Sequence, residues 1–531
     1  MGMTNPRHLK ALLLLVAVIG MASCGGGGGA DPAPGTTPPP AAASFSFPVV
    51  ATTTTPQGCA REDGKAGVSA VTYYKRINAS DLDQVVLPCD SPSGQRVLRS
   101  QPGLVPTLLY VDAAGTVVAE LRDSLGLVRS IFAMLPGSAQ EIELAATASP
   151  SPPVIGFVGV FNNRVLYVAL TTGHAVELRS VTISQTPTTT VVGGAFGAMQ
   201  VHDRPVGGRV LFATVNAFSQ FDTEYRSVRP DGTDPLVLRT VLGLGPNPSA
   251  VPFPLHVLGD REVIYSELVP ITGPSIRMLA IDTPGSDLLI AQTSVVLDQK
   301  ILTVPGTTDR FVFLGSRANV TEPVLTEVTA QRGNLGIKTL ALPTTELLGF
   351  SQGRLYIEGV LPPMPNLLRG EVSWLGEGNT APRTVLTGLR AAYWVTDRAI
   401  VFSRTPLFSN RITYARSDLD GTNERAGSPA SLIPGENEIP TRAGERIYYL
   451  REPDTINNDV ATLDLVTGIE TVVYRPNPLQ DRIRFFRVGG RLIVWRPAIG
   501  ADPGWIDSVD LDGNDLRRLA QSPDIMEAKP F

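Results

Sequence analysis

The stretch Gly489-Gly490-Arg491-Leu492-Ile493-Val494-Trp495 is one copy of a phrase that occurs eight times in this chain. In each copy a turn containing Gly, Asp or Asn leads into an arginine, and a run of apolar residues follows. The eight arginines are Arg164, Arg209, Arg261, Arg310, Arg354, Arg398, Arg446 and Arg491. Successive arginines lie 44 to 52 residues apart. A strand-rich repeat of this length predicts a β-propeller, in which each repeat forms one four-stranded blade.

The last copy of the repeat contains all four expected strands. We expect the first two at 483–488 and 491–496, the third at 506–511 and the fourth at 516–519. The last two are joined by Asp512-Gly513, which we interpret as a type I′ turn. Apolar residues are consecutive in the second strands, as expected of strands covered on both faces. The sequence therefore predicts an all-β propeller of eight blades, with seven as the alternative.

The turns also carry a family resemblance. Ser417-Asp-Leu-Asp420-Gly-Thr-Asn423 and Ser508-Val-Asp-Leu-Asp512-Gly-Asn514 both place an Asp-x-Asp-Gly turn before the last strand of a blade. This pattern resembles the TolB-type propellers and their relatives, and it covers roughly residues 151–521. The resemblance implies the fold and a tendency towards binding proteins or glycans, and it transfers no active site.

The N-terminus has the pattern of an export signal over residues 1–23. Arg7 and Lys10 precede an apolar run at 11–19, and Met21-Ala22-Ser23 leads directly to Cys24. This arrangement resembles the lipobox of bacterial lipoproteins, although Met21 occupies a place where that family usually has leucine. The resemblance implies lipid attachment at Cys24 and anchoring in the bacterial cell envelope, at the outer membrane because Gly25 follows the cysteine. The alternative is an ordinary secretory signal.

The rest of the chain divides into four parts. Residues 24–44 are rich in glycine and proline and predict a lipidated tether with a reach of about 25 Å. Residues 45–150 are expected to form a β extension that caps or completes the propeller. Residues 151–521 form the repeat, and residues 522–531 are interpreted as a C-terminal tail.

Two cysteines, Cys59 and Cys89, remain in the mature chain. In an oxidising compartment the simplest interpretation of an even pair is one disulfide, which would staple the 45–150 region. The alternative is a metal pair, but histidine and cysteine ligands are lacking nearby. We therefore predict a disulfide.

The chain contains no convincing catalytic motif or metal site. Gly349-Phe-Ser351-Gln-Gly353 matches the nucleophile elbow, but a strand rather than a helix follows it, so we predict a hairpin turn. Asp510-Leu-Asp512-Gly-Asn514 resembles a calcium loop with its glycine at the wrong offset. His174, His202 and His256 fall in different blades without metal-ligand spacing. We predict no catalytic residue, metal or cofactor.

The repeat arginines allow two interpretations. If the blades are equivalent, the eight side chains form a cationic ring on one face, which could focus an anionic ligand. However, an acidic residue directly precedes four of them, and the Asp-Gly turns should lie on the same face. We therefore favour an arginine latch between strands over an anion site. Closure of one ring also predicts that Arg164 and Arg491 lie in neighbouring blades.

Function is expected at the opposite face, where long, varied loops link second to third strands. Their candidate ligand-binding residues are Phe218, Phe221, Met364, Phe408 and Trp505. Packing of these side chains against neighbouring loops is the alternative. The net charge of −5 argues against a nucleic-acid partner.

We therefore expect a non-catalytic, envelope-anchored lipoprotein that binds a protein or glycan through these loops. The alternative function is a lyase or hydrolase that degrades a glycan or another envelope polymer at the propeller channel. Paired carboxylates at one channel mouth, one with a raised pKa, would favour that enzyme.

Overall fold

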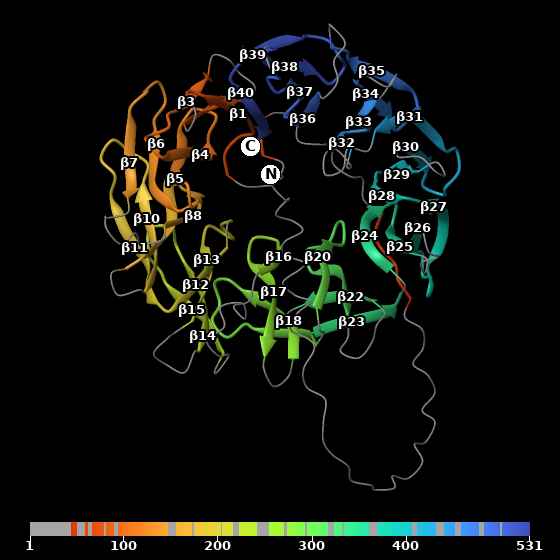
Figure 1. Ribbon diagram of the computed structural model, residues 1–531. Helices are drawn as coiled ribbons and strands as arrows, with labels where there is room; N and C mark the ends of the chain where they lie inside the picture. Colours follow the sequence, from red (N-terminus) through yellow and green to blue (C-terminus); the bar gives the residue numbers. More distant parts are fainter. Residues whose placement is uncertain are drawn as a thin grey trace, which may run out of the picture.

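The computed structural model describes residues 44–49, 59–61, 66–78, 81–89, 94–146, 155–171, 175–202, 204–215, 222–241, 254–269, 273–292, 295–316, 323–331, 334–342, 344–360, 370–405, 411–431, 440–451, 458–476, 483–499 and 502–531. Within these residues forty strands form ten antiparallel four-stranded sheets. Figure 1 shows the sheets arranged radially around a common centre, which is the architecture of a β-propeller. No helix in the described ranges is long and apolar enough to cross a membrane.

We number the sheets as blades and give each from its inner to its outer strand. Blade 1 is β40 (Ile525–Pro530), β1 (Ala70–Arg76), β2 (Leu82–Pro88) and β3 (Arg96–Leu98); blade 2 is β4 (Leu104–Val111), β5 (Val117–Asp123), β6 (Val128–Met134) and β7 (Glu141–Ala146); blade 3 is β8 (Ile155–Phe161), β9 (Arg164–Leu170), β10 (Val176–Thr182) and β11 (Thr189–Phe196). Blade 4 is β12 (Ala198–Val201), β13 (Val210–Val215), β14 (Thr223–Val228) and β15 (Leu236–Val241); blade 5 is β16 (Pro254–Leu258), β17 (Glu262–Val269), β18 (Gly273–Ala280) and β19 (Leu288–Gln292); blade 6 is β20 (Val295–Thr303), β21 (Arg310–Ser316), β22 (Pro323–Gln331) and β23 (Asn334–Ala341).

Blade 7 is β24 (Thr344–Ser351), β25 (Arg354–Val360), β26 (Gly370–Gly376) and β27 (Arg383–Leu389); blade 8 is β28 (Ala391–Val395), β29 (Ala399–Arg404), β30 (Arg411–Asp418) and β31 (Arg425–Ser431). Blade 9 is β32 (Thr441–Ala443), β33 (Arg446–Arg451), β34 (Asp459–Asp464) and β35 (Glu470–Tyr474); blade 10 is β36 (Arg484–Val488), β37 (Arg491–Arg496), β38 (Gly504–Asp510) and β39 (Arg517–Ser522). All eight repeat arginines begin, or directly precede, the second strand of a blade, which confirms the predicted four-stranded repeat.

The predicted number of blades was wrong, because the ring has ten rather than eight or seven. Blades 1 and 2 lie between the blades that carry Arg491 and Arg164. The expectation that these two arginines lie in neighbouring blades was therefore wrong. Blades 1 and 2 could not be recognised from the repeat because their second strands, β1 and β5, follow Ser69 and Thr116 rather than an arginine.

The residues expected as a β extension and a tail belong to this ring. The hairpin at Leu108–Val118, which resembles the second half of a blade in sequence, joins the first and second strands of blade 2. Residues 525–530 form β40, which pairs with β1 through Val71 and Pro530 and supplies the inner strand of blade 1. Cys59 and Cys89 form the predicted disulfide beside that blade.

The core lies between blades rather than within them. Leu355 and Ile357 of β25 pack towards blade 6, whereas Tyr356 packs towards blade 8, and all three are at most 2% exposed. This explains the consecutive apolar residues of the second strands, since both faces of each blade are covered. Among the described residues ten such clusters join successive blades, and the one with Val71 and Ile493 closes the ring between blades 1 and 10.

The Asp-Gly hairpins between third and fourth strands are not the type I′ turns that the sequence predicted. At the Asp512-Gly513 pair only the glycine has positive φ, at 84°, and the next positive value is 46° at Asp515. The Gly513 N–H donates to the Asp510 carbonyl at 3.1 Å, as in a type I turn followed by a left-handed glycine. Two consecutive positive φ values occur instead between first and second strands, for example 47° at Gln352 and 72° at Gly353.

The glycine of the Asp-Gly hairpin also sets how closely two blades pack. A Cβ added to Gly421 in blade 8 would lie 2.1 Å from the carbonyl oxygen of Val385 in the outer strand of blade 7. At Gly513 in blade 10 the same addition would lie 2.7 Å from the carbonyl oxygen of Val473 in blade 9. Only glycine leaves room for this contact, so the turn of one blade rests on the backbone of the blade before it.

A short N-terminal segment packs on the same end of the propeller. Phe45 and Phe47 are 0% and 6% exposed in the core between blades 6 and 7. The Phe45 N–H donates to the Asn379 carbonyl at 3.1 Å, and Arg310 donates to the Ser46 carbonyl at 3.0 Å. We call the end that carries the first-to-second and third-to-fourth hairpins the turn face, and the opposite end the loop face. The segment 44–49 therefore docks on the turn face.

The close contact at Gly421 predicts an unequal pair of glycine substitutions. Gly421 and Gly126 have φ of 84° and 77°, but nothing lies within 4 Å of a Cβ placed on Gly126. Gly126→Ala should cost only the strain of an alanine in the left-handed conformation, about 1 kcal/mol of folding stability. Gly421→Ala should lower the thermal melting temperature clearly more, because the methyl group must also separate blades 7 and 8. Equal melting temperatures for the two variants would contradict this account of blade spacing.

Candidate functional site

The repeat arginines lie on the turn face and contact the hairpins there. Their side-chain partners are Ser180 and Thr190 for Arg164, Ser227 and Asp234 for Arg209, Asp282 for Arg261, Glu327 for Arg310, Glu377 for Arg354, Asp464 and Asp512 for Arg446, and Ser508 and Asp515 for Arg491. For Arg398 the recorded contact is made by its backbone N–H, which donates to the Thr396 hydroxyl at 3.2 Å.

Arg491 illustrates the shared geometry. It donates to the Asp515 carboxylate at 2.9 Å and to the Asp515 carbonyl at 2.6 Å, across the end of its own blade. Hydrogen bonds from Arg517 and Arg491 lower the pKa of Asp515 from its ordinary value. Arg446 reaches further and pairs with Asp512 of the next blade. The guanidinium groups of Arg491 and Arg446 thus donate to groups of the propeller itself.

The sequence motifs that resemble reactive sites occupy structural positions. Ser351 is 3% exposed and pairs with Arg354 across a hairpin between β24 and β25, so no helix follows it. The Asp510 carboxylate accepts the backbone N–H groups of Asp512 at 3.0 Å and Asn514 at 2.7 Å, as a turn does. In the described part of the chain no three His, Cys, Asp or Glu residues are grouped as metal ligands.

The two described histidines, His202 and His256, have separate polar contacts. His202 contacts the Arg204 carbonyl through Nδ1 at 2.8 Å, and His256 contacts the Thr303 hydroxyl through Nε2 at 2.9 Å. Burial lowers the pKa of His256 from its ordinary value. His174 lies outside the described residues. Each described histidine therefore has a local polar contact within the propeller.

Of the five candidate loop residues, only Trp505 lies in the described part of the chain, while Phe218, Phe221, Met364 and Phe408 lie outside it. Trp505 is the second residue of β38, at the loop face, and is 6% exposed. Its ring centroid lies 6.2 Å from that of Tyr474 in blade 9, and the Arg518 guanidinium lies 5.3 Å from it. Trp505 therefore packs between two blades and is not an exposed loop residue.

Trp505 lines a cavity of about 410 Å³ between blades 9 and 10, which we call the rim cavity. Its lining residues are Tyr474, Arg475, Pro476, Arg496, Asp502, Pro503, Trp505, Asp507, Leu516, Arg518 and Gln521. Most of them come from the loop-face ends of β35, β37 and β38, and the rest from the outer strand β39 and its approach. The volume lies within the range of about 300–1,000 Å³ that is usual for small-molecule sites.

In the rim cavity two of the three guanidinium groups face the solvent while their carboxylate partners are buried. The Arg518 side chain is 46% exposed and pairs with the Asp507 carboxylate, which is 4% exposed. The Arg475 side chain is 58% exposed and donates at 3.0 Å to Asp459, which is 0% exposed. Asp502, 72% exposed, is the one carboxylate at the opening among the lining residues. The buried carboxylates hold the arginines in fixed positions, and Arg518 also donates through Nη1 to the Gln521 side-chain oxygen at 3.1 Å.

A third guanidinium, that of Arg496, forms part of the wall. Its side chain is 8% exposed, and Nη2 donates to the Asp502 carboxylate at 3.3 Å. Its Nε has no hydrogen-bond partner among the described residues. A buried cation with one long bond to an exposed partner is poorly satisfied, because burial of a charge is unfavourable without close pairing. The wall therefore contains a cation that an added acceptor would stabilise.

Buried polar groups brace the floor of the rim cavity. The Tyr474 hydroxyl donates to the Asp507 carboxylate at 2.7 Å. Burial, together with the charge of Asp507, raises the pKa of Tyr474 from its ordinary value, so Tyr474 stays a neutral donor. The hydrogen bonds to Tyr474 and Arg518 together fix Asp507 below the opening.

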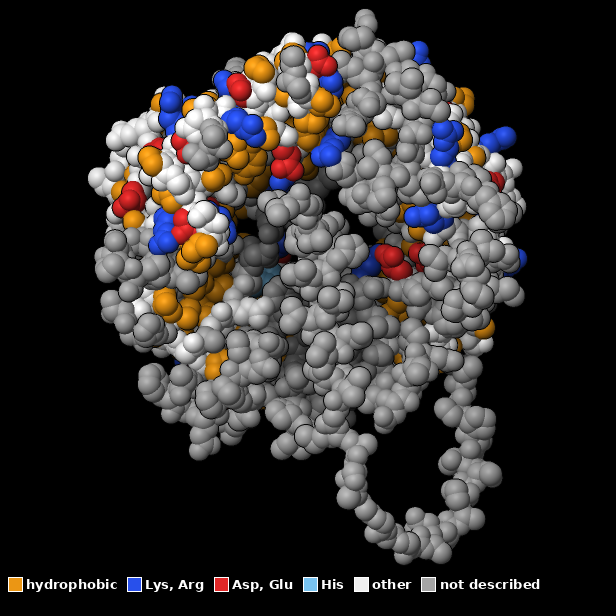
Figure 2. Space-filling view, viewed as in Figure 1, with side chains coloured by type: hydrophobic (Ala, Val, Ile, Leu, Met, Phe, Trp, Pro, Cys, Tyr) orange, Lys and Arg blue, Asp and Glu red, His pale blue; other side chains and the backbone are white. Residues whose placement is uncertain are grey.

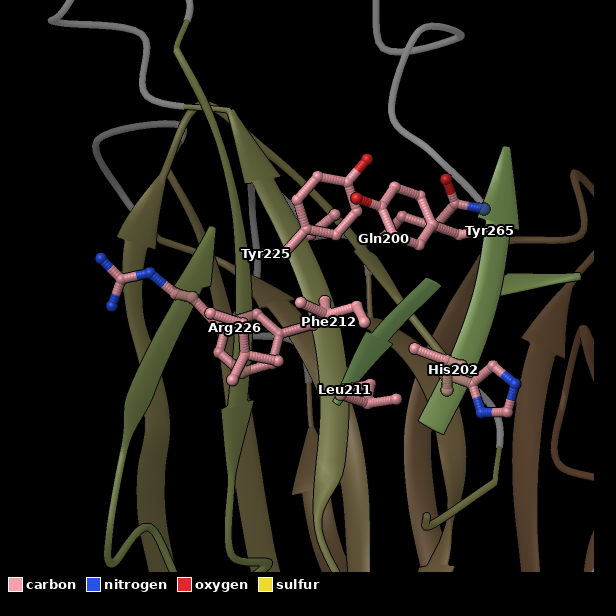
Figure 3. A pocket seen from close by; sticks show the side chains of 11 residues that line it. Gln200, His202, Leu211, Phe212, Tyr225, Arg226 and Tyr265 are labelled. Atoms are coloured by element: carbon pink, nitrogen blue, oxygen red, sulfur yellow. The ribbon is translucent and has the colours of Figure 1, made fainter. Parts of the chain in front are cut away.

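Two other cavities are smaller. The one in Figure 3 lies between blades 4 and 5, where the rings of Tyr225 and Tyr265 face each other at 4.7 Å, and it holds about 30 Å³. That volume suits a single water molecule. A cavity of about 220 Å³ on the turn face is lined by Arg446 and Asp512, which bond to each other. Among the described residues on the side seen in Figure 2, basic and acidic side chains are scattered and often lie near one another.

Sequence reasoning missed Arg496, Asp507 and Arg518, which give the rim cavity its charge. A signal was present for two of them. Asp507 interrupts the apolar run of a third strand, and Arg496 follows the apolar second strand directly. A charged residue at a position expected to be buried indicates pairing or a site. The partner of Asp507 could not be identified from the sequence, because Tyr474 lies 33 residues away in another blade.

Near the inner edge of blade 7 two carboxylates lie opposite each other. Glu346 of β24 pairs in register with Glu358 of β25, and the Ala392 N–H donates to Glu358 at 3.1 Å. Burial, with the Glu346 charge as a further contribution, raises the pKa of Glu358 to about 7. Glu346 is 44% exposed and lies 3.4 Å from the Lys300 ammonium group. This pair has one of the features that would favour an enzyme.

Comparisons with known proteins yield similar folds without a family. No family model matches the chain, and no curated protein matches it. TolB from Acinetobacter baumannii is 13% identical over 61% of this chain and 82% of its own, with a TM-score of 0.25. The β-propeller domain of the Trilobed protease from Pyrococcus furiosus is 8% identical over 70% and 99%, with a TM-score of 0.30. A puromycin-hydrolyzing peptidase of Mycobacterium tuberculosis is 12% identical over 66% and 60%, with a TM-score of 0.29. At these values the comparisons carry no argument about activity or ligand.

Proposed function

We propose that this protein is an envelope-anchored, non-catalytic β-propeller that binds its ligand in the rim cavity. The observation that carries the proposal is the cavity itself, with Arg475, Arg496 and Arg518 around it and room of about 410 Å³. A rigid ring that presents fixed donors at one end is suited to binding, since little conformational freedom is lost when a ligand arrives.

The location in the cell envelope is proposed from the sequence. Cys24 would carry the lipid, and residues 25–43 would link it to the docked segment that begins at Ser44. That segment is held on the turn face, where Lys338 donates to the Ser44 carbonyl at 3.1 Å. The lining of the rim cavity comes mainly from the loop-face ends of the strands, about 20 Å away for a strand of seven residues. A lipid anchor would therefore hold the turn face towards the membrane and leave the rim cavity open to solvent.

One observation favours a second candidate, an enzyme that cleaves a glycan or another envelope polymer. In that function Glu358, protonated through its raised pKa, would act as the general acid, and Glu346 would be the ionised carboxylate. Glu358 is only 8% exposed and its carboxylate accepts a backbone hydrogen bond from blade 8, which suits a structural acid better. We therefore rank binding first.

The anchor is tested by Cys24→Ser expressed with its export signal in a proteobacterial host. The wild-type protein should sediment with the membrane fraction and incorporate labelled fatty acid, whereas the variant should be exported and remain soluble. Intact pairing of Cys59 with Cys89 on a non-reducing gel provides the folding control. A wild-type protein that is fully soluble after export would remove the anchor from the proposal.

The carboxylate pair is tested by Glu358→Gln. The folded-state pKa is raised, so the contribution of Glu358 to stability is fully present below its ordinary pKa of 4.5 and is lost as pH rises through about 7. The melting temperature of wild type should therefore fall relative to that of Glu358→Gln between roughly pH 4.5 and 7. As a binding protein, wild type should release no reducing sugar from acidic polysaccharides. Release that disappears in Glu358→Gln would establish the enzyme instead.

A further inference from the structure

We infer that the rim cavity is specific for an acidic saccharide and that Arg475 and Arg496 bind its carboxylate. This inference rests on the proposed binding function and narrows it to a class of ligand. It is carried by three features of the described residues: exposed guanidinium groups on buried carboxylates, an underpaired guanidinium in the wall, and acceptors next to the donors.

The rim cavity presents positive charge to the solvent, although its lining contains nearly as many carboxylates as guanidinium groups. Asp459 and Asp507 lie beneath Arg475 and Arg518 and are 0% and 3% exposed. A ligand at the opening therefore meets the guanidinium N–H groups before it meets these carboxylates. Guanidinium groups form strong paired hydrogen bonds with carboxylates, so an acidic group is the natural complement.

Arg496 provides the second, independent argument. It is 7% exposed, its Nε lacks a partner in the described part of the chain, and its bond to Asp502 is 3.3 Å long. Asp502 is 72% exposed, so its carboxylate can move into solvent when a competing acid arrives. A ligand carboxylate at the wall would pair with a cation that the described residues leave poorly paired.

The neutral part of the ligand is indicated by the other lining groups. Gln521 and Asp502 add polar groups beside the arginines and accept hydrogen bonds from Arg518 and Arg496, whereas the only strongly exposed apolar side chain in the lining is Leu516, at 60%. Sugar hydroxyls both donate and accept hydrogen bonds, so they match such a mixed wall. A peptide would need larger apolar pockets for its side chains. A uronic acid residue within a glycan combines hydroxyls with a carboxylate.

Binding of trigalacturonate and of its fully methyl-esterified, neutral form tests the inference by titration calorimetry. We expect wild type to bind the acid at least tenfold more tightly than the ester. Arg496→Gln and Arg475→Gln should each weaken binding of the acid at least tenfold and remove most of the preference. Arg475 is 58% exposed and Arg451 also pairs with Asp459, so Arg475→Gln should fold even if Arg496→Gln does not.

Arg517→Gln serves as the matched control, because it removes the same charge from blade 10 at the turn face. It should leave the affinity for the acid unchanged. Equal affinity for acid and ester, lost on Arg475→Gln, would overturn the acidic specificity while leaving binding in the rim cavity intact. Acid binding that survives both cavity variants, or falls equally in Arg517→Gln, would overturn the inference. Binding of neither compound would overturn the inference as well.

Discussion

The structure depends on one pairing between the two ends of the chain, that of β40 with β1. In the described part of the chain each blade buries its faces against the neighbouring blades, and the apolar clusters lie between blades. An open row would leave two apolar faces exposed, those of blades 1 and 10. The register of Val71 with Pro530 prevents this, because it places the last strand inside the first blade. Ile525 and Ala528 of that strand then complete the cluster that holds blade 10. Closure therefore converts ten weak local units into one continuous core.

Closure also separates the two ends of the ring into different roles. The turn face is crowded with bonds within the protein: arginines latch hairpins, glycine turns rest on the preceding blade, and the segment 44–49 fills the seam between blades 6 and 7. At the strand ends of the loop face, in contrast, the repeat does not require particular residues. There the seam between blades 9 and 10 opens into the rim cavity. The proposed anchor at the turn face and the proposed ligand at the loop face would both be consistent with this asymmetry.

The repeat could be predicted because both of its signals are local. An arginine after a tight turn and an apolar run arise in each second strand, whatever lies elsewhere in the chain. The number of blades could not be predicted because β1 and β5 lack the arginine, and because β40 pairs with residues at least 450 positions away. Trp505 was expected to be an exposed loop residue because it follows a long connection, whereas it is buried, and its burial depends on Tyr474 in another blade. The charged wall of the rim cavity was missed for the same reason, since the pairs of Asp507 and Asp459 are not readable from local pattern.

The central claim is that β40 closes the ring, and the fluorescence of Trp495 tests it most directly. Trp495 is 3% exposed in the cluster between blades 10 and 1, next to Ile525. In a protein whose other three tryptophans are replaced by phenylalanine, removal of residues 523–531 should expose this side chain. The account predicts a red-shifted emission and strong quenching by acrylamide, while the same protein with residues 523–531 retained stays protected. Unchanged emission and protection after the truncation would show that blades 10 and 1 are held together without the C-terminal strand, and would contradict closure by β40.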